Sequence, residues 1–123
     1  MQFKAPKNTE KYEWTQHAII KMKQYGLTAQ RILRVVNNPQ RVEEGIVKNT
    51  VAVMQPASTR VKDGKRVWNR EIWAMYQPKV KSEKLKVKSF GANKIRIISA
   101  WRYPGISPKR NPIPDDILRE LEV

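Results

Sequence analysis

The sequence contains no cysteine and a single histidine, His17, among its 123 residues. Without cysteine, disulfide bonds and thiolate metal sites are excluded, and one imidazole is a poor basis for a zinc site. We therefore expect any chemistry that the chain carries out to use neither a metal nor another cofactor.

Long apolar runs are also missing. The longest uninterrupted ones span only a few residues, and the N-terminal segment MQFKAPKNTEKYEW has no apolar core of the kind found in signal peptides. A membrane-spanning helix needs roughly 20 consecutive apolar residues. The sequence therefore predicts a cytoplasmic protein with no membrane partner.

Acidic residues are scarce, with 11 Asp and Glu against 25 Lys and Arg, which gives a formal net charge of +14. Four of the acids lie in the last nine residues, so residues 1–114 hold 24 basic side chains against 7 acidic ones. A compact domain with this excess favours a polyanionic partner, and nucleic acid is the leading class. An anionic membrane surface is the rival class. Here, however, the basic residues follow strand-like stretches instead of one amphipathic helix.

Apolar residues are nevertheless plentiful enough for a core. They make up 40% of the chain and include four tryptophans, which excludes a disordered polycation. The length fits one domain, residues 1–123. We expect a loose N-terminus over 1–11, an α+β body over 12–103, and a proline-rich segment with a short C-terminal helix over 104–123.

Two helices are predicted near the N-terminus, after a short strand at 12–14. Thr15 is a good N-cap for the first helix, Gly26 a good stop signal, and Thr28 a good N-cap for the second helix. The apolar spacing of the second helix is clear, with Asn38-Pro39 as its end. That apolar face comprises Ala29, Ile32, Leu33 and Val36. Because Gly26-Leu27 is the whole connection, the two helices are expected to form a hairpin.

The remainder of the body reads as strands. The candidates are 41–47, 50–55, 66–77, 84–90 and 94–103, with turn signals between them that include Asp63-Gly64. The expected fold is α+β: an N-terminal helical hairpin packed on a curved antiparallel sheet of about four to five strands, followed by the short C-terminal helix. In that helix Ile117, Leu118 and Leu121 form an apolar stripe.

The sheet face away from the helices is expected to be open and cationic. Lysine and arginine can meet phosphates there, and aromatic rings can stack on bases. The candidate phosphate contacts are Lys84, Lys86, Lys88, Arg96, Arg102, Lys109 and Arg110, and the candidate stacking residues are Trp73, Trp101 and Tyr103. The alternatives are that the aromatic residues pack in the core and that each lysine lies on a solvated face.

His17 falls in the first turn of the first predicted helix. There the helix dipole disfavours a proton on the imidazole, and a neutral imidazole near a phosphate can act as a general base. Lys21 follows one turn later on the same side, where it could neutralise a phosphoryl oxygen. The alternative is an ordinary, partly exposed histidine at a helix start.

Residues 17–41, HAIIKMKQYGLTAQRILRVVNNPQR, resemble the opening of a family of small bacterial and phage proteins of unassigned role. In that family a His and a basic residue precede a turn, and a second helix ends in Asn-Pro. The later stretch KIRIISAWRYPG fits the same plan. The family is similar in layout to the RelE, ParE and BrnT toxins, which are metal-independent ribonucleases or gyrase inhibitors paired with an antitoxin.

The resemblance implies an endoribonuclease in which an RNA 2′-hydroxyl attacks the adjacent phosphate. On this chain it makes His17 the base, with Lys21 and either Arg96 or Arg102 stabilising the phosphate. Tyr103 or Arg102 would then assist the leaving oxygen. It also implies an acidic antitoxin as a partner.

The sequence departs from the family pattern at Tyr25, where the family has an arginine. Two other functions stay open. One is a non-catalytic, basic nucleic-acid-binding regulator, and the other is a ParE-like toxin that acts on a protein.

Overall fold

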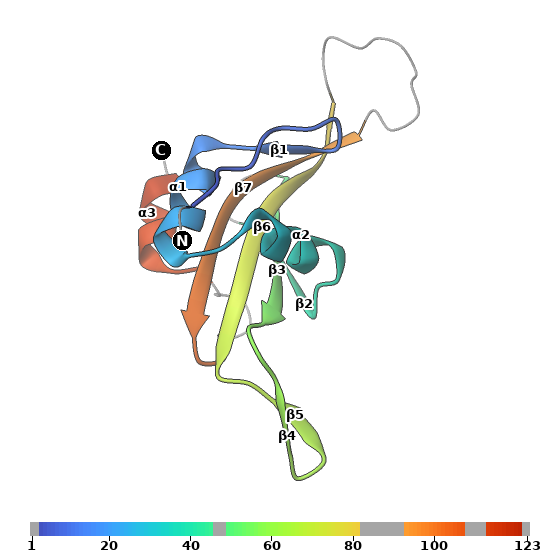
Figure 1. Ribbon diagram of the computed structural model, residues 1–123, viewed down its shortest axis with the longest axis vertical. Coiled ribbons are helices and arrows are strands. Elements are labelled where there is room, and N and C mark those ends of the chain that lie inside the picture. The colour runs from blue at the N-terminus through green and yellow to red at the C-terminus, as the bar shows by residue number, and fades with distance from the viewer. Residues whose placement is uncertain (1–2, 46–48, 82–92, 108–112, 122–123) are drawn as a thin grey trace.

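The computed structural model describes residues 3–45, 49–81, 93–107 and 113–121. No helix within these ranges is long and apolar enough to cross a membrane. The elements, in chain order, are β1 (Tyr12–Trp14), α1 (Gln16–Tyr25), α2 (Ala29–Asn37), β2 (Arg41–Glu44), β3 (Val51–Pro56), β4 (Arg60–Lys62), β5 (Lys65–Val67), β6 (Arg70–Lys81), β7 (Asn93–Pro104) and α3 (Asp115–Leu121) (Figure 1). The strand expected at 84–90 lies outside the described residues.

The main sheet has five strands in the order β1-β7-β6-β3-β2, and β4 pairs with β5 in a separate two-stranded sheet. The prediction of an antiparallel sheet is wrong at one edge, because β1 runs parallel to β7, with Glu13 opposite Arg96. All other neighbouring strands are antiparallel. Nothing in the local pattern of a three-residue strand specifies which distant strand it joins, so the sequence did not indicate this pairing.

The caps of the first two helices are as predicted. The Thr15 hydroxyl accepts from the backbone N–H of Ala18 at 3.1 Å, and the Thr28 hydroxyl accepts from that of Arg31 at 3.1 Å. Gly26 adopts the left-handed conformation, φ 65°, which glycine reaches without strain, and so ends α1. These boundaries follow from local sequence chemistry alone.

The expected N-terminal helical hairpin is not formed, although the α+β class holds. The two helices pack on different strands: α1 along β7, and α2 across β3 and β6 (Figure 1). The physical reason lies in the apolar faces. The buried residues of α2, Ile32, Val35 and Val36, pack against the sheet, so the short connection does not press the two helices together.

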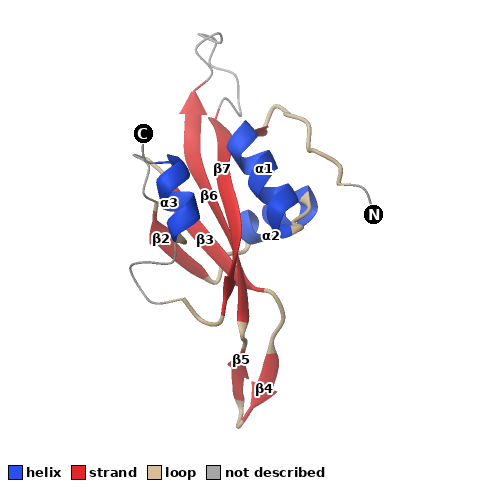
Figure 2. Ribbon diagram, turned by 90° about the vertical axis from the view of Figure 1, so that its left-hand side faces the viewer, coloured by secondary structure: helices blue, strands red, loops and turns tan. Residues whose placement is uncertain are grey.

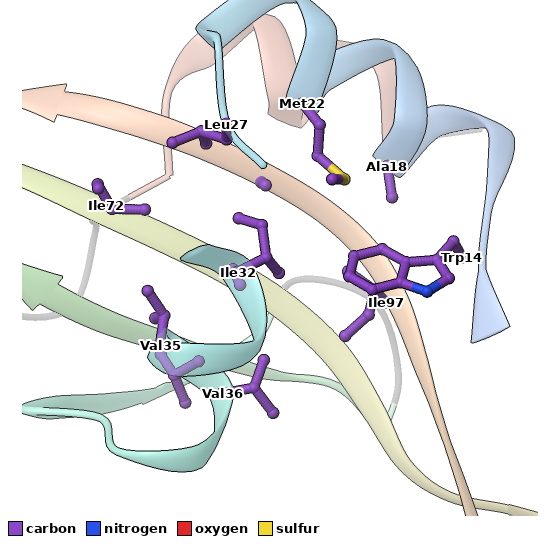
Figure 3. Close-up of a cluster of buried hydrophobic side chains, with 12 residues drawn as sticks. Trp14, Ala18, Met22, Leu27, Ile32, Val35, Val36, Ile72 and Ile97 are labelled. Atoms are coloured by element: carbon purple, nitrogen blue, oxygen red, sulfur yellow. The ribbon is translucent and has the colours of Figure 1, made fainter. Parts of the chain in front are cut away.

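One face of the sheet forms the larger core, beneath α1 and α2. Trp14 of β1, Ala18 and Met22 of α1, and Ile32, Val35 and Val36 of α2 all point into the space between the helices and the sheet (Figure 3). The buried members of this cluster are Trp14, Ala18, Met22, Leu27, Ile32, Val35, Val36, Val53, Ile72, Ala74, Ile97 and Ala100.

The opposite face, expected to be open, is covered in part by α3 (Figure 2). Ile113 and Ile117 pack there against a second cluster that contains the stacked, fully buried rings of Trp73 and Trp101, whose centroids are 5.9 Å apart. Burying the two isoleucine side chains stabilises this arrangement by roughly 3–6 kcal/mol. A helix as short as α3 is marginal in water, so its formation depends on this docking.

A buried carboxylate fastens the segment that leads from β7 towards α3. Glu71 has no solvent exposure, and accepts hydrogen bonds from the Nε1 atoms of Trp68 at 2.9 Å and Trp73 at 3.0 Å. The backbone N–H and hydroxyl of Ser107 also donate to it, at 3.2 and 2.6 Å. Burial raises the pKa of Glu71, but these hydrogen bonds outweigh burial and lower it below its usual value. A charged Glu71 therefore fixes residue 107 on the sheet.

The β4–β5 hairpin extends beyond the main sheet (Figures 1 and 2). Its turn residues, Asp63 and Gly64, both have positive φ, 53° and 76°, as the tight two-residue turns of β-hairpins require. The turn was predicted, but the strand expected at 66–77 is divided into β5 and β6.

Candidate functional site

The face of α1 that points away from the larger core is polar. His17, Lys21 and Tyr25 follow one another at intervals of four residues, so their side chains lie in a row along one side of the helix. On α3, Asp116 and Glu120 have the same interval. The two rows meet, and their contacts join α1, β7 and α3 into one polar cluster.

Lys21 is the centre of this cluster. Its side chain is only 2% exposed, and its Nζ lies 3.2 Å from Asp116 Oδ2 and 2.8 Å from Glu120 Oε2. A further hydrogen bond runs to Gln24 Oε1 at 3.0 Å. Burial by itself lowers the pKa of Lys21, but the hydrogen bonds and charges of the two carboxylates outweigh it and raise the pKa. Lys21 is thus a buried cation neutralised by α3.

His17 lies between a hydroxyl and a carboxylate. Its Nε2 is 2.9 Å from Ser99 Oγ on β7, and its Nδ1 is 3.5 Å from Glu120 Oε2. With the tautomer that carries its proton on Nδ1, Nε2 accepts from the Ser99 hydroxyl and Nδ1 faces the carboxylate. This order of hydroxyl, imidazole and carboxylate is the one in which a histidine removes a proton from a hydroxyl.

The protonation state of His17 suits a base. Burial is the largest influence and lowers its pKa, the charge of Glu120 opposes this, and Lys21 adds to the lowering. The net lowering from 6.5 leaves the imidazole neutral at pH 7. Ser99, however, has no solvent exposure, so a substrate can reach Nε2 only after the covering groups shift.

Tyr25 and Asp116 complete the cluster. The Tyr25 hydroxyl donates to Asp116 Oδ2 at 3.2 Å, and burial followed by the charge of Asp116 raises the pKa of the phenol. Burial also acts to raise the pKa of Asp116, but the hydrogen bond and charge of Lys21 outweigh it and lower that pKa. Tyr25 therefore stays protonated, and Asp116 stays charged.

Only two of the five predicted catalytic residues meet in this cluster, His17 and Lys21. The guanidinium of Arg96 instead binds the Glu13 carboxylate of β1 and Gln77 Oε1. Arg102 Nε donates to the Tyr25 carbonyl at 2.7 Å, at the far end of α1 from His17. Arg102 therefore lies beside the Tyr25 end of the cluster, about 12 Å along the helix axis from His17. Tyr103 is partly buried against the second hydrophobic cluster.

Two of the predicted stacking residues are not available to a base. Trp101 is fully buried and stacks on Trp73, so neither ring presents a face to solvent on which a base could stack. Arg96, Arg102 and Tyr103, also predicted as nucleic-acid contacts, have the positions just given. The remaining predicted contacts lie outside the described residues: Lys84, Lys86, Lys88, Lys109 and Arg110.

Sequence reasoning missed Tyr25, Ser99, Asp116 and Glu120 as members of the site. One signal was available, because the row on α1 and the acidic pair on α3 share the four-residue interval and carry complementary groups. Ser99 gave none, since a single serine within an apolar strand has no distinguishing pattern.

Two surface hollows, of about 590 and 280 Å³, lie near the base of the β4–β5 hairpin, and Ser58 and Thr59 line both. Within the described ranges no group of three or more His, Asp or Glu side chains is arranged to hold a metal ion.

Comparisons of this chain with protein-family models, with curated proteins and with solved structures each found no match.

Proposed function

We propose that this protein is a metal-independent endoribonuclease with His17 as its general base. One observation carries the proposal: a neutral imidazole has one nitrogen on a hydroxyl and faces a carboxylate with the other. In the reaction an RNA 2′-hydroxyl takes the place of the Ser99 hydroxyl, and its proton passes to Nε2. The 2′-oxygen bonds to phosphorus as the bond to the 5′-oxygen breaks, which leaves a cyclic phosphate.

Lys21 supplies the charge that this step needs. Its Nζ now holds carboxylate oxygens of Asp116 and Glu120, and the Asp116 oxygen stands where a phosphoryl oxygen of the substrate would bind. A cation fixed at that point stabilises the negative charge that develops on the phosphate. Tyr25, protonated and in the same network, is the group that gives a proton to the leaving 5′-oxygen.

The Asp116 carboxylate of α3 competes with the substrate in this scheme. Lys21 and Ser99 are buried, so RNA binds only when Asp116 exchanges for phosphate at Lys21. Glu120 stays in place, because its carboxylate is the one that faces His17 Nδ1. Replacing Asp116 by Asn keeps a hydrogen-bond acceptor for Lys21 but removes the competing charge, and this variant is expected to lower KM for RNA.

The test uses a labelled RNA in EDTA, with a DNA of the same sequence as the substrate control because it lacks the 2′-hydroxyl. The parent is expected to cut only RNA and to leave cyclic phosphate ends. Removal of a general base lowers the reaction rate by about 10²- to 10⁴-fold, so the rate at which the His17→Ala variant cleaves RNA is expected to fall by that factor. Lys23→Ala, an exposed position on the same helix, is the matched control. An inactive parent, or a His17→Ala variant that cuts as fast as the parent, would remove the proposal.

A second candidate, a non-catalytic nucleic-acid-binding regulator, is favoured by one observation. In this conformation Lys21 and Ser99 are buried, whereas cations of the β4–β5 hairpin are exposed. It predicts that RNA is bound intact and that His17→Ala changes nothing. It also predicts that the affinity for RNA falls steeply as the salt concentration rises.

The endoribonuclease proposal also implies a cytoplasmic location and an acidic antitoxin partner. Charge complementarity to a strongly basic protein gives such a partner fast association. Size-exclusion chromatography of the two proteins expressed together would detect the complex, and separate elution of the two proteins would contradict this part of the proposal.

A further inference from the structure

The β4–β5 hairpin, Arg60–Val67, belongs to no part of the site described so far. It carries four basic residues and one acid, Asp63, which lies in the turn. All four cations are exposed: Arg60, Lys62, Lys65 and Arg66. We call this segment the basic hairpin.

The register of the two strands gathers the cations on one side. Arg60 lies opposite Val67, Lys62 opposite Lys65, and Val61 opposite Arg66. Residues directly opposite each other share a face, as do residues two apart on one strand. Arg60, Lys62 and Lys65 therefore lie on the same face, with Arg66 and Val61 on the other.

None of these four cations makes an ion pair or a side-chain hydrogen bond within the described part of the chain. Some cations of the main body differ from them. Lys21 binds Asp116 and Glu120, and Arg96 binds Glu13. The positive charge of the basic hairpin is therefore unneutralised, whereas Lys21 and Arg96 are paired with acids.

The like charges on one face destabilise the hairpin itself. Like charges directly opposite each other destabilise a strand pair, and an isolated two-stranded hairpin is marginal in water. Val61 adds an apolar side chain that is 73% exposed. A segment whose local choices work against its own folding is a place to expect a ligand.

We propose that the basic hairpin is a nucleic-acid-binding arm that contacts phosphodiester groups through Arg60, Lys62 and Lys65. A two-stranded ribbon is narrow enough to follow a nucleic-acid backbone or enter a groove, and phosphate contacts of lysine and arginine supply most of such affinity. The inference rests on the nucleic-acid partner of the proposed function but not on its chemistry.

The arm lies well away from His17. Ser99 is paired with Met75 of β6, and the hairpin begins beyond Arg70, five residues along that strand. Five residues of strand span about 17 Å. A strand of nucleic acid held by the arm has to be longer than this before it also reaches His17. We therefore expect short oligonucleotides to gain less from the arm than long ones.

The test measures binding in a His17→Ala background, so that cleavage does not consume the probe. The probe is a fluorescein-labelled single-stranded RNA of about 20 nucleotides, long enough to bridge arm and site at the spacing just given. The variant is Arg60→Gln/Lys62→Gln/Lys65→Gln. The matched control, Lys4→Gln/Lys7→Gln/Lys23→Gln, removes the same charge from exposed positions elsewhere.

The hairpin variant is expected to bind the RNA at least about tenfold more weakly, and its salt dependence should be shallower by about 2 in log–log slope, for three lost contacts. The control variant should stay within about threefold of the background. An equal loss in both triple variants would overturn the proposal, since total charge would then explain the binding. That result would leave the cleavage proposal untouched, because cleavage is judged by His17 alone.

Two further probes identify the source of the phosphate. A DNA of the same sequence bound equally well supports recognition of the backbone alone, whereas a preference for RNA adds contacts to the 2′-hydroxyl. Vesicles of phosphatidylserine and phosphatidylcholine form the third arm. If they bind the background protein more tightly than either nucleic acid, and lose that binding in the hairpin variant, the arm is a membrane contact and the proposal fails.

Discussion

Lys21 and the lysines of the basic hairpin are the same residue type in opposite circumstances. Lys21 is 2% exposed and is held by two carboxylates of α3, whereas Lys62 and Lys65 are exposed and face each other without an acid. The first cation is part of the folded structure, and the other two are available to a ligand. A formal charge of +14 therefore describes two separate populations.

The difference is also energetic. A buried cation that loses its partners is left uncompensated in a low-dielectric environment, which costs several kcal/mol in the worst case. An exposed cation that is removed costs almost nothing to the fold. Mutations in the two regions should therefore affect different measurements, stability in one and binding in the other.

The largest effect on stability is expected for Lys21→Met, which keeps the apolar stem and removes the charge. It should lower the free energy of unfolding by about 2 kcal/mol, because Asp116 and Glu120 lose charge-assisted hydrogen bonds but can turn towards water. Urea unfolding measures this as a shifted midpoint with an unchanged slope. Lys23→Met on the same helix is the control. A Lys21→Met variant as stable as the parent would show that the apolar contacts of Ile113 and Ile117 hold α3 without the ion pairs.

The next effect is the dependence of stability on pH. The lowered pKa of Asp116 contributes stability above its ordinary value of 3.8, and this contribution is lost as pH falls through the lower folded value. The raised pKa of Lys21 contributes stability below 10.5, and this is lost as pH rises through the higher folded value. The melting temperatures of the parent and of Lys21→Met, measured across both pH ranges, should therefore converge at the lowest and at the highest pH. Curves that stay parallel throughout would contradict the coupling.

The smallest effect on stability is expected in the basic hairpin. Because Lys62 and Lys65 repel each other, Lys65→Glu should leave the free energy of unfolding within about 0.5 kcal/mol of the parent or raise it slightly. Urea unfolding of this variant provides the check. A loss of more than 1 kcal/mol would show that these cations serve the fold and would end the contrast with Lys21.

Local chemistry predicted the parts of the fold that depend on a few neighbouring residues. Thr15, Gly26 and Thr28 set the helix boundaries, and Asp63-Gly64 set the turn of the hairpin, because each satisfies backbone geometry within a few positions. His17 and Lys21 were placed together for the same reason, since a helix fixes residues four apart on one side.

Contacts between segments far apart in the chain could not be predicted in the same way. The pairing of β1 with β7 and the docking of α3 beside α1 both join segments about 80 to 100 residues apart, for which one sequence gives no register. From the sequence alone, the four acids of the last nine residues show only that the preceding residues carry most of the basic charge. Their role against Lys21 required the position of α3, which depends on where Ile113 and Ile117 find an apolar surface.

The parallel pairing of β1 with β7 also bears on how the chain emerges during its synthesis. Residues 12–14 can find their partner only after residues 95–97 have left the ribosome, and Lys21 meets its carboxylates later still. Until then His17 and Lys21 of α1 lack the covering side chains of α3, and Trp14 lacks its final neighbours. Contacts so distant in sequence slow folding, so the nascent chain passes through a stage in which the polar face of α1 is uncovered.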